Sequence, residues 1–401
     1  MIISDALRYE VAQELSERID RESRFSTKLN MQYSVLPSYT QLGMAALLPH
    51  DSLEFDSKDR LYVLADGRST KGIEARDAIL SAVGGKAIRY DDLTKLKVSE
   101  IKELYKSCNV LYVYHNHIDA TGDTEKTELE TVDACEKTFK ELGEVVKKLA
   151  SGNVHNMIIT ADHGFLYQDR DLDGTEWLSE QPKGDTVWVR KRRFSIGANL
   201  APGRAFVTFN AAQIGMDDPR NEGTSIQVPN SIMRLRMQGA GVKYVHGGAA
   251  LQEIVVPVLH VSKGRSAADD VRAVEFTILQ RTDRLSSRQL TVEFFQNEPV
   301  GGKIRARTIL AGLWGRDTAG NNVLISNETP VAFDLLGQEK SERHVTATLM
   351  LTSDAERFNG TNIELRLREK TDGSNVLVML DQKARYFFKQ GVVADDAGFF
   401  D

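Results

Sequence analysis

Two short apolar, β-rich runs in this chain lead directly into acidic or imidazole side chains. Met1–Ser4 is followed by Asp5, and Ile158–Thr160 is followed, after Ala161, by Asp162 and His163. In an open α/β sheet the carboxyl ends of the strands present side chains to a shared crevice. The pattern therefore predicts an α/β fold in which these side chains meet at one edge of the sheet.

The first part of the chain alternates between helical and strand patterns. Apolar residues recur at helical spacing in Ala6–Arg18 and in the long amphipathic segment Leu129–Ala150, and a short helix is expected at Gln41–Leu48. Asn109–Tyr114 and Met157–Thr160 have the composition of buried strands. This alternation predicts a mostly parallel sheet with helices on both faces.

The pattern changes after Phe165. Residues 167–240 are rich in Gly, Asp, Pro and Arg and are expected to form a cap or insertion, and residues 264–270 look like a linker. Short alternating strands from Val271 onward predict a C-terminal antiparallel β-sandwich. The expected organisation is a core over 1–166, the cap over 167–240, the end of the core over 241–263, the linker over 264–270 and the sandwich over 271–401. Because few residues precede Asp5, the first strand is expected to be truncated at its N-terminal side.

Composition limits the class of protein. The chain has 401 residues, of which 41% are hydrophobic and 27% charged, and it has no apolar run of about 18 residues, so no membrane span is expected. Its two cysteines, Cys108 and Cys135, favour a reducing, cytoplasmic setting over a disulfide scaffold. A formal net charge of -6 argues against nucleic-acid binding over the whole surface, although a local basic path stays compatible with it.

Each candidate metal ligand also has a structural interpretation. Asp5 can cap a helix, with Ser4 as a rival cap, and Asp162 and His163 can serve as capping or surface residues. Adjacent Asp and His at a strand end can alternatively reach one metal ion, and Gly164 permits a sharp turn behind them.

Four further candidates lie elsewhere in the sequence. Asp119 and Asp123 are either an acidic turn or two carboxylates converging on a cation, and His246, before Gly247 and Gly248, is either a structural histidine or a ligand. Thr40 is either a plain N-cap or a nucleophile at the first turn of a helix, where the helix dipole and free backbone N–H groups favour a phosphoryl group.

A basic run flanked by aromatic residues lies inside the expected cap, in Trp188–Phe194. Such a run can contact phosphates and stack on bases, or it can be the solvated edge of a β-hairpin. We interpret it as a phosphate or nucleic-acid path, which favours a phosphodiester substrate over a monoester. The candidate residues are Arg190, Lys191, Arg192, Arg193, Arg234 and Arg236.

The motifs together resemble one family. S-D-A-L-R-Y-E at Ser4–Glu10, T-A-D-H-G-F at Thr160–Phe165 and H-G-G-A-A-L-Q-E at His246–Glu253 are similar to strings of the PglZ family, within the alkaline phosphatase superfamily. The resemblance covers Met1 to about Lys263. It implies an alkaline phosphatase-like core and two adjacent divalent metal ions, zinc or manganese, with magnesium possible.

The resemblance also implies a ligand set. Asp5, Thr40, Asp162 and His163 would form one site, and Asp119, Asp123 and His246 the other. Many relatives have His where Asp123 stands, and this departure raises the preference for metals that favour oxygen ligands. His115 and His117 are alternatives to Asp123.

The implied reaction is phosphoryl transfer through a phosphothreonine at Thr40. PglZ proteins belong to phage-defence systems of the Pgl and BREX type, so the implied partners are other defence subunits, including a DNA methyltransferase. We therefore expect a phosphodiesterase or nuclease-type hydrolase. The alternative is a catalytically weak scaffold that assembles such partners.

Overall fold

A computed structural model describes residues 1–124, 126–238, 241–265, 270–370 and 376–390. The chain divides into two compact units, Met1–Ala267 and Ala268–Asp401. Residues 266–269 of the expected linker lie outside the described residues. No helix in the described part of the chain is long and apolar enough to cross a membrane.

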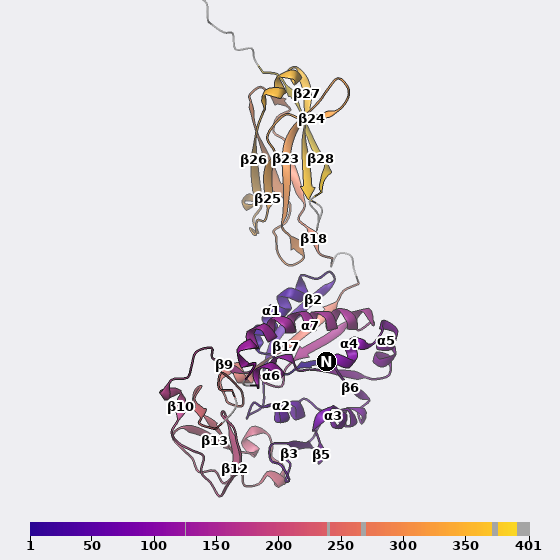
Figure 1. The fold of residues 1–401 in the computed structure, drawn as a ribbon. Coiled ribbons are helices and arrows are strands. Elements are labelled where there is room, and N and C mark those ends of the chain that lie inside the picture. The colour runs from indigo at the N-terminus through magenta and orange to yellow at the C-terminus, as the bar shows by residue number, and fades with distance from the viewer. Residues whose placement is uncertain (125, 239–240, 266–269, 371–375, 391–401) are drawn as a thin grey trace, which may run out of the picture. The chain divides into compact units, whose positions relative to one another are not determined.

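The first unit is built on a six-stranded sheet, as the alternating pattern predicted (Figure 1). Its strands are, in spatial order, β2 (Phe25–Tyr33), β17 (Val255–Lys263), β8 (Asn156–Thr160), β1 (Ile2–Ser4), β7 (Val110–His115) and β6 (Gly85–Arg89). Strands β8, β1, β7 and β6 are parallel, whereas β17 runs antiparallel to both β8 and β2. The sheet is therefore mostly parallel, with an antiparallel pair at one side.

The side chains of strand β7 pack into two apolar cores, one on each face of the sheet. Leu111 and Val113 pack into the cluster that contains helix α7, while Tyr112 between them packs against the cluster that contains helix α2. Successive strand residues point to opposite faces, so the run from Val110 to Tyr114 reads as continuously apolar because helices cover both faces of the sheet.

The helices lie where this packing requires them. Figure 1 places α1 and α7 on one face of the sheet and α2 and α3 on the other. The helices are α1 (Tyr9–Asp20), α2 (Thr40–Ala46), α3 (Gly72–Ser81), α4 (Tyr90–Lys95), α5 (Val98–Lys106), α6 (His117–Gly122), α7 (Thr131–Ser151) and α8 (Leu251–Ile254). Helix α1 begins three residues later than its apolar spacing predicted, because Ala6 has a positive φ of 60° and interrupts the helix.

The first unit also contains several smaller sheets. The region expected to be a cap contains a four-stranded antiparallel sheet and one short pair of strands, and a second short pair joins the segments at its two borders. The four strands are β11 (Thr186–Arg190), β12 (Ser195–Ala198), β14 (Thr224–Pro229) and β13 (Phe206–Asn210). The pairs are β9 (Leu166–Tyr167) with β16 (Tyr244–Val245) and β10 (Trp177–Leu178) with β15 (Arg234–Leu235), and a further sheet joins β3 (Leu53–Phe55), β4 (Val63–Ala65) and β5 (Arg68–Ser69).

The second unit has its own apolar core and is rich in mainly antiparallel strands. One sheet joins β19 (Phe276–Leu279), β21 (Gln289–Gln296) and β26 (His344–Met350). A larger one joins β20 (Arg284–Leu285), β28 (Leu377–Phe388), β27 (Thr361–Lys370), β23 (Arg307–Arg316), β24 (Asn322–Leu324) and β25 (Thr329–Phe333), and β18 (Arg272–Ala273) pairs with β22 (Ile304–Arg305). The strand content agrees with the sequence, and the sandwich arrangement stays a prediction.

Candidate active site

The strand order brings the predicted acidic residues to one edge of the sheet. Strand β1 lies between β7 and β8 and runs parallel to both, with Ser4 opposite His115 and Ile3 opposite Thr160. Asp5 and Asp162 therefore follow adjacent strands at the same end. Asp119 reaches this edge from helix α6, directly after β7.

Asp5, Asp162 and His163 form a buried cluster whose ligand atoms all lie within 4.8 Å of one another. The Nε2 atom of His163 lies 3.5 Å from Asp5 Oδ1 and 3.4 Å from Asp162 Oδ2. Neither of these carboxylate oxygens has a hydrogen-bond partner among the described residues.

The charge state of this cluster follows from its burial. Burial, then the charges of Asp162 and Asp119, raise the pKa of Asp5 well above its ordinary value. Burial raises the pKa of Asp162 to about 6 and lowers that of His163 to about 3. The imidazole is therefore neutral, which is the form that binds metals.

The hydrogen bond of His163 Nδ1 determines which way Nε2 of the same ring points. Its Nδ1 lies 2.8 Å from the carbonyl oxygen of Gly164, so Nδ1–H donates there and the lone pair of Nε2 faces the two carboxylates. Nε2 of His163, Oδ1 of Asp5 and Oδ2 of Asp162 thus lie close together, and each has a lone pair available. A cation between them would satisfy all three.

A second cluster joins Asp119 and His246 to the same histidine. The ligand atoms of Asp119, His163 and His246 lie within 4.8 Å of one another, and His246 Nε2 is 3.7 Å from Asp119 Oδ1. The Nδ1–H of His246 donates to the Ser38 carbonyl at 3.3 Å, and the hydroxyl of Tyr244 donates to Asp119 Oδ1 at 3.2 Å. The rings of His163 and His246 are stacked with centroids 4.2 Å apart.

Thr40 is the first residue of α2, where the sequence predicted it, and faces the first cluster. Its Oγ1 lies 3.0 Å from His163 Nε2. Helix α2 lies close to Asp162 because Gly43 packs against that residue. A Cβ at Gly43 would lie 2.6 Å from the Asp162 carbonyl oxygen and 2.8 Å from the Asp162 Cβ.

Gly164 is also packed too closely for a side chain, since a Cβ there would lie 2.2 Å from the Gln252 carbonyl oxygen. Close packing is therefore the observed reason for glycine at position 164.

A buried ion pair holds the loop that carries His246. The side chains of Arg193 and Glu253 are both 0% exposed and 2.7 Å apart. The backbone N–H of Gly248 donates to Glu253 Oε1 at 2.8 Å, and Ser38 Oγ donates to the carbonyl of Gly248 at 2.7 Å. Gly247 has a φ of 114°, a conformation that favours glycine.

The predicted ligand Asp123 does not join either cluster of described residues. Helix α6 continues through Gly122, so Asp123 lies at its C-cap, where the residue is exposed. The alternatives His115 and His117 lie outside both clusters too: their ring nitrogens are 2.9 Å and 3.6 Å from Glu141 Oε2, respectively.

The predicted basic path is only partly at the surface. Arg193 and Arg234 were expected to contact a substrate, but they are 0% and 1% exposed, so they are structural residues. Arg190, Lys191 and Arg236 are exposed and Arg192 is half-buried.

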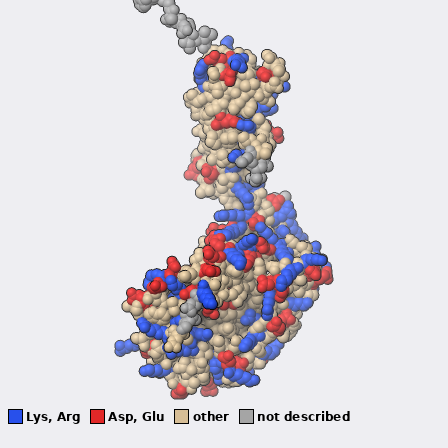
Figure 2. All heavy atoms as spheres, viewed as in Figure 1, with Lys and Arg blue, Asp and Glu red and all other residues tan. Residues whose placement is uncertain are grey.

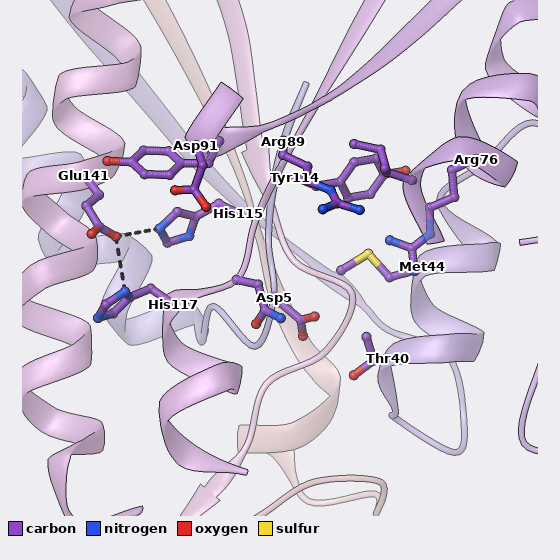
Figure 3. A pocket seen from close by; sticks show the side chains of 13 residues that line it. Asp5, Thr40, Met44, Arg76, Arg89, Asp91, Tyr114, His115, His117 and Glu141 are labelled. Atoms are coloured by element: carbon purple, nitrogen blue, oxygen red, sulfur yellow. Dashed lines mark hydrogen bonds and ion pairs between the residues drawn. The ribbon is translucent and has the colours of Figure 1, made fainter. Parts of the chain in front are cut away.

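Several residues of the pocket beside the clusters lie outside the predicted site residues (Figure 3). This pocket has a volume of about 440 Å³ and reaches from Asp5 and Thr40 to Arg76, Arg89 and Glu141. Arg76, Arg89 and Glu141 belong to no short motif, and only their position in the fold brings them to the site.

The donor set suits divalent cations. Carboxylate oxygens and neutral imidazole nitrogens are ligands of zinc and manganese, and an ion between Asp5 and Asp162 would satisfy the oxygens that have no hydrogen-bond partner. Each candidate ligand, His163 and His246, is oriented by a backbone carbonyl on its other ring nitrogen, as is usual in metal sites.

Comparison with known proteins agrees with the resemblance in the motifs. A profile described as the "BREX system PglZ alkaline phosphatase-like domain" matches residues 1–261. Two crystal structures of phosphonoacetate hydrolase from Sinorhizobium meliloti 1021, with phosphonoacetate and with phosphonoformate, share 10% identity with this chain and have TM-scores of 0.39 and 0.40. Each alignment covers 65% of this chain and 88% of that structure.

Two curated relatives are more similar in sequence. Alkaline phosphatase-like protein BrxZ of Escherichia coli O9:H4 (strain HS) is 38% identical over 87% of this chain and 40% of its own length. Alkaline phosphatase-like protein PglZ of Bacillus cereus (strain H3081.97) is 37% identical over 88% of this chain and 41% of its own length. The chain thus spans less than half the length of these relatives. It belongs to the PglZ family.

Proposed function

We propose that this chain is a metal-dependent phosphodiesterase that uses Thr40 as its nucleophile. The observation that carries the proposal is the hydroxyl of Thr40 beside two partnerless buried carboxylate oxygens and the lone pair of His163 Nε2. Thr40 also lines the pocket beside the clusters, so a phosphoryl group bound there would have access to its hydroxyl.

The candidate ligands fall into two groups, one for each ion. Asp5, Asp162 and His163 would hold one divalent ion, and Asp119 and His246 would hold the other. When bound, these ions would lower the pKa of the Thr40 hydroxyl and offset negative charge on the phosphoryl group. Oγ1 of Thr40 would form a bond to phosphorus as the bond to the leaving oxygen breaks, and water would then hydrolyse the phosphothreonine ester.

A diester substrate is supported by the cations near the site. Arg192 and Arg236 lie over the ring of Trp177, with guanidinium carbons 5.7 Å and 5.8 Å from its centroid. Arg192 directly precedes Arg193, whose ion pair holds the His246 loop. Positive and negative side chains are interspersed on the face in Figure 2, so a polyanion would depend on such a local path.

The biological setting is part of the proposal. Relatives named BrxZ and PglZ and the BREX description of the matching domain support a role in a bacterial phage-defence system. We further propose that the protein acts in the cytoplasm, beside other defence subunits that include a DNA methyltransferase.

The reaction class is tested with bis-p-nitrophenyl phosphate and p-nitrophenyl phosphate as substrates for the metal-loaded protein. We expect faster turnover of the diester, and a tenfold preference for the monoester would overturn the diester assignment. The double variant Lys191→Ala/Arg236→Ala should lose activity on single-stranded DNA but keep its activity on the small diester.

The nucleophile is tested by separating metal binding from chemistry. Asp162→Ala should lose bound metal, measured by elemental analysis, because a ligand is removed. Thr40→Ala should keep the metal and lose turnover, while Thr40→Ser retains a hydroxyl and part of the activity. Wild-type activity in Thr40→Ala would remove covalent catalysis, and a metal-free, inactive wild type would favour a scaffold.

A further inference from the structure

One cation of the pocket stands out by its contacts. Arg76, on α3, lies in the pocket wall together with Asp5 and Thr40 (Figure 3). Its Nε donates to the carbonyl of Thr70 at 3.1 Å, and its guanidinium carbon lies 5.0 Å from the centroid of the Tyr114 ring. These two contacts orient the guanidinium, and its interaction with the Tyr114 hydroxyl opposes the effect of burial on the pKa of that phenol.

The charge of Arg76 is not neutralised by an ion pair. No carboxylate in the described part of the chain lies within 4.0 Å of its guanidinium, although its charge acts on Asp5, where it opposes the effect of burial on the pKa. Arg89 lines the same pocket but differs in both respects: its side chain is 57% exposed and pairs with Glu74 at 3.6 Å.

A half-buried guanidinium with several N–H groups matches the paired oxygens of a phosphoryl group. We propose that Arg76 binds the non-bridging oxygens of the phosphoryl group that reacts with Thr40, and is therefore a catalytic residue. This rests on the proposed function, since it places the reacting phosphorus beside Thr40. Divalent ions held by Asp5, Asp162 and Asp119 would offset the charge of these carboxylates, so the charge of Arg76 would remain for the substrate.

The test compares Arg76→Ala and Arg76→Lys with Arg89→Ala as the matched control. Turnover of the ester, inhibition by inorganic phosphate and bound metal are measured for each metal-loaded protein. Arg76→Ala should lose about 100-fold in kcat/KM, the order expected for one transition-state donor, and phosphate inhibition should weaken at least about tenfold. Arg76→Lys should recover part of both losses, because it restores the charge without the paired donors.

Arg89→Ala should keep phosphate inhibition within about threefold, because an exposed, paired cation contributes little. Metal content should be the same in all four proteins, which separates phosphate binding from a structural defect. Unchanged phosphate inhibition in Arg76→Ala, or an equal loss in Arg89→Ala, would overturn the assignment.

A second readout separates this proposal from the hydrolase proposal. Inorganic phosphate should raise the melting temperature of the metal-loaded wild type and not that of Arg76→Ala. If the wild type is inactive but shows this shift, phosphate binding by Arg76 stands and the hydrolase assignment fails. If phosphate gives neither inhibition nor a shift in the wild type, the role of Arg76 fails.

Discussion

The contact between Gly43 and Asp162 makes a prediction that joins stability to catalysis. A Cβ at Gly43 would lie 2.6 Å from the Asp162 carbonyl oxygen, whereas ordinary contact begins near 3.4 Å. Gly43→Ala therefore requires α2 or the Asp162 segment to retreat by about 0.8 Å. Overpacking of this kind costs about 1–3 kcal/mol, and a displacement near 1 Å at reacting groups costs on the order of 100-fold in rate.

Gly143→Ala is the matched control, because Gly143 lies inside α7 and a Cβ there meets nothing within 4 Å. Both substitutions gain up to about 1 kcal/mol of helix propensity, so the difference between the variants isolates the steric cost. We expect the free energy of unfolding in urea, measured with metal bound, to be about 1–3 kcal/mol lower for Gly43→Ala than for Gly143→Ala. Turnover should fall about 100-fold in Gly43→Ala alone. Equal stability and equal turnover in the two variants would refute the reasoning.

Three further outcomes are expected. Glu253→Gln leaves the buried guanidinium of Arg193 without its counter-charge and should lower the free energy of unfolding in urea by about 3 kcal/mol; a change below about 1 kcal/mol would contradict it. Added Mn²⁺ should raise the melting temperature of metal-stripped protein more at pH 8 than at pH 5.5, because burial raises the pKa of Asp162 to about 6 and a proton must be displaced below that pH. A shift that does not depend on pH would argue against this site. Asp119→Ala should lose bound metal in elemental analysis while Asp123→Ala keeps it, since Asp123 is exposed and outside both clusters; equal loss in both would restore Asp123 as a ligand.

The parts of the site that could be predicted from the sequence are those fixed by local chain geometry. Asp5 and Asp162 each follow a strand, and parallel neighbours must present such residues at one edge. Thr40 begins a helix after a turn that its own residues specify. At these positions a few consecutive residues determine the backbone conformation. The order of the strands in the sheet then brings the side chains together.

Asp123 marks the limit of that reasoning. Its spacing from Asp119 was interpreted as an irregular turn, but the chain forms helix α6 through Gly122. The tight packing of Gly122 against the Tyr244 ring, where a Cβ would lie 2.4 Å from a ring carbon, involves residues 122 positions apart. Contacts between residues so far apart in the sequence cannot be predicted from a short motif.

Arg76 was missed for the same reason. It belongs to a helix that carries no ligand and no characteristic string, and only the packing of α3 against β6, the neighbour of β7, places it in the pocket. The role of an arginine can be inferred once the groups that it contacts are known. These contacts depend on the fold and cannot be read from a short sequence motif.

The basic run shows how the cap and the site depend on each other. Four consecutive cations suggest a solvated surface, yet Arg193 is buried against Glu253, 60 positions away. Phe194 beside it stacks on Tyr39, the N-cap of α2, with ring centroids 4.7 Å apart. One strand-to-strand turn of the cap thus supports both the loop of His246 and the helix of Thr40, which come from opposite ends of the core sequence. The cap is therefore part of the structure that positions the site, and the cations that remain exposed beside it are placed at a fixed position relative to the ligands.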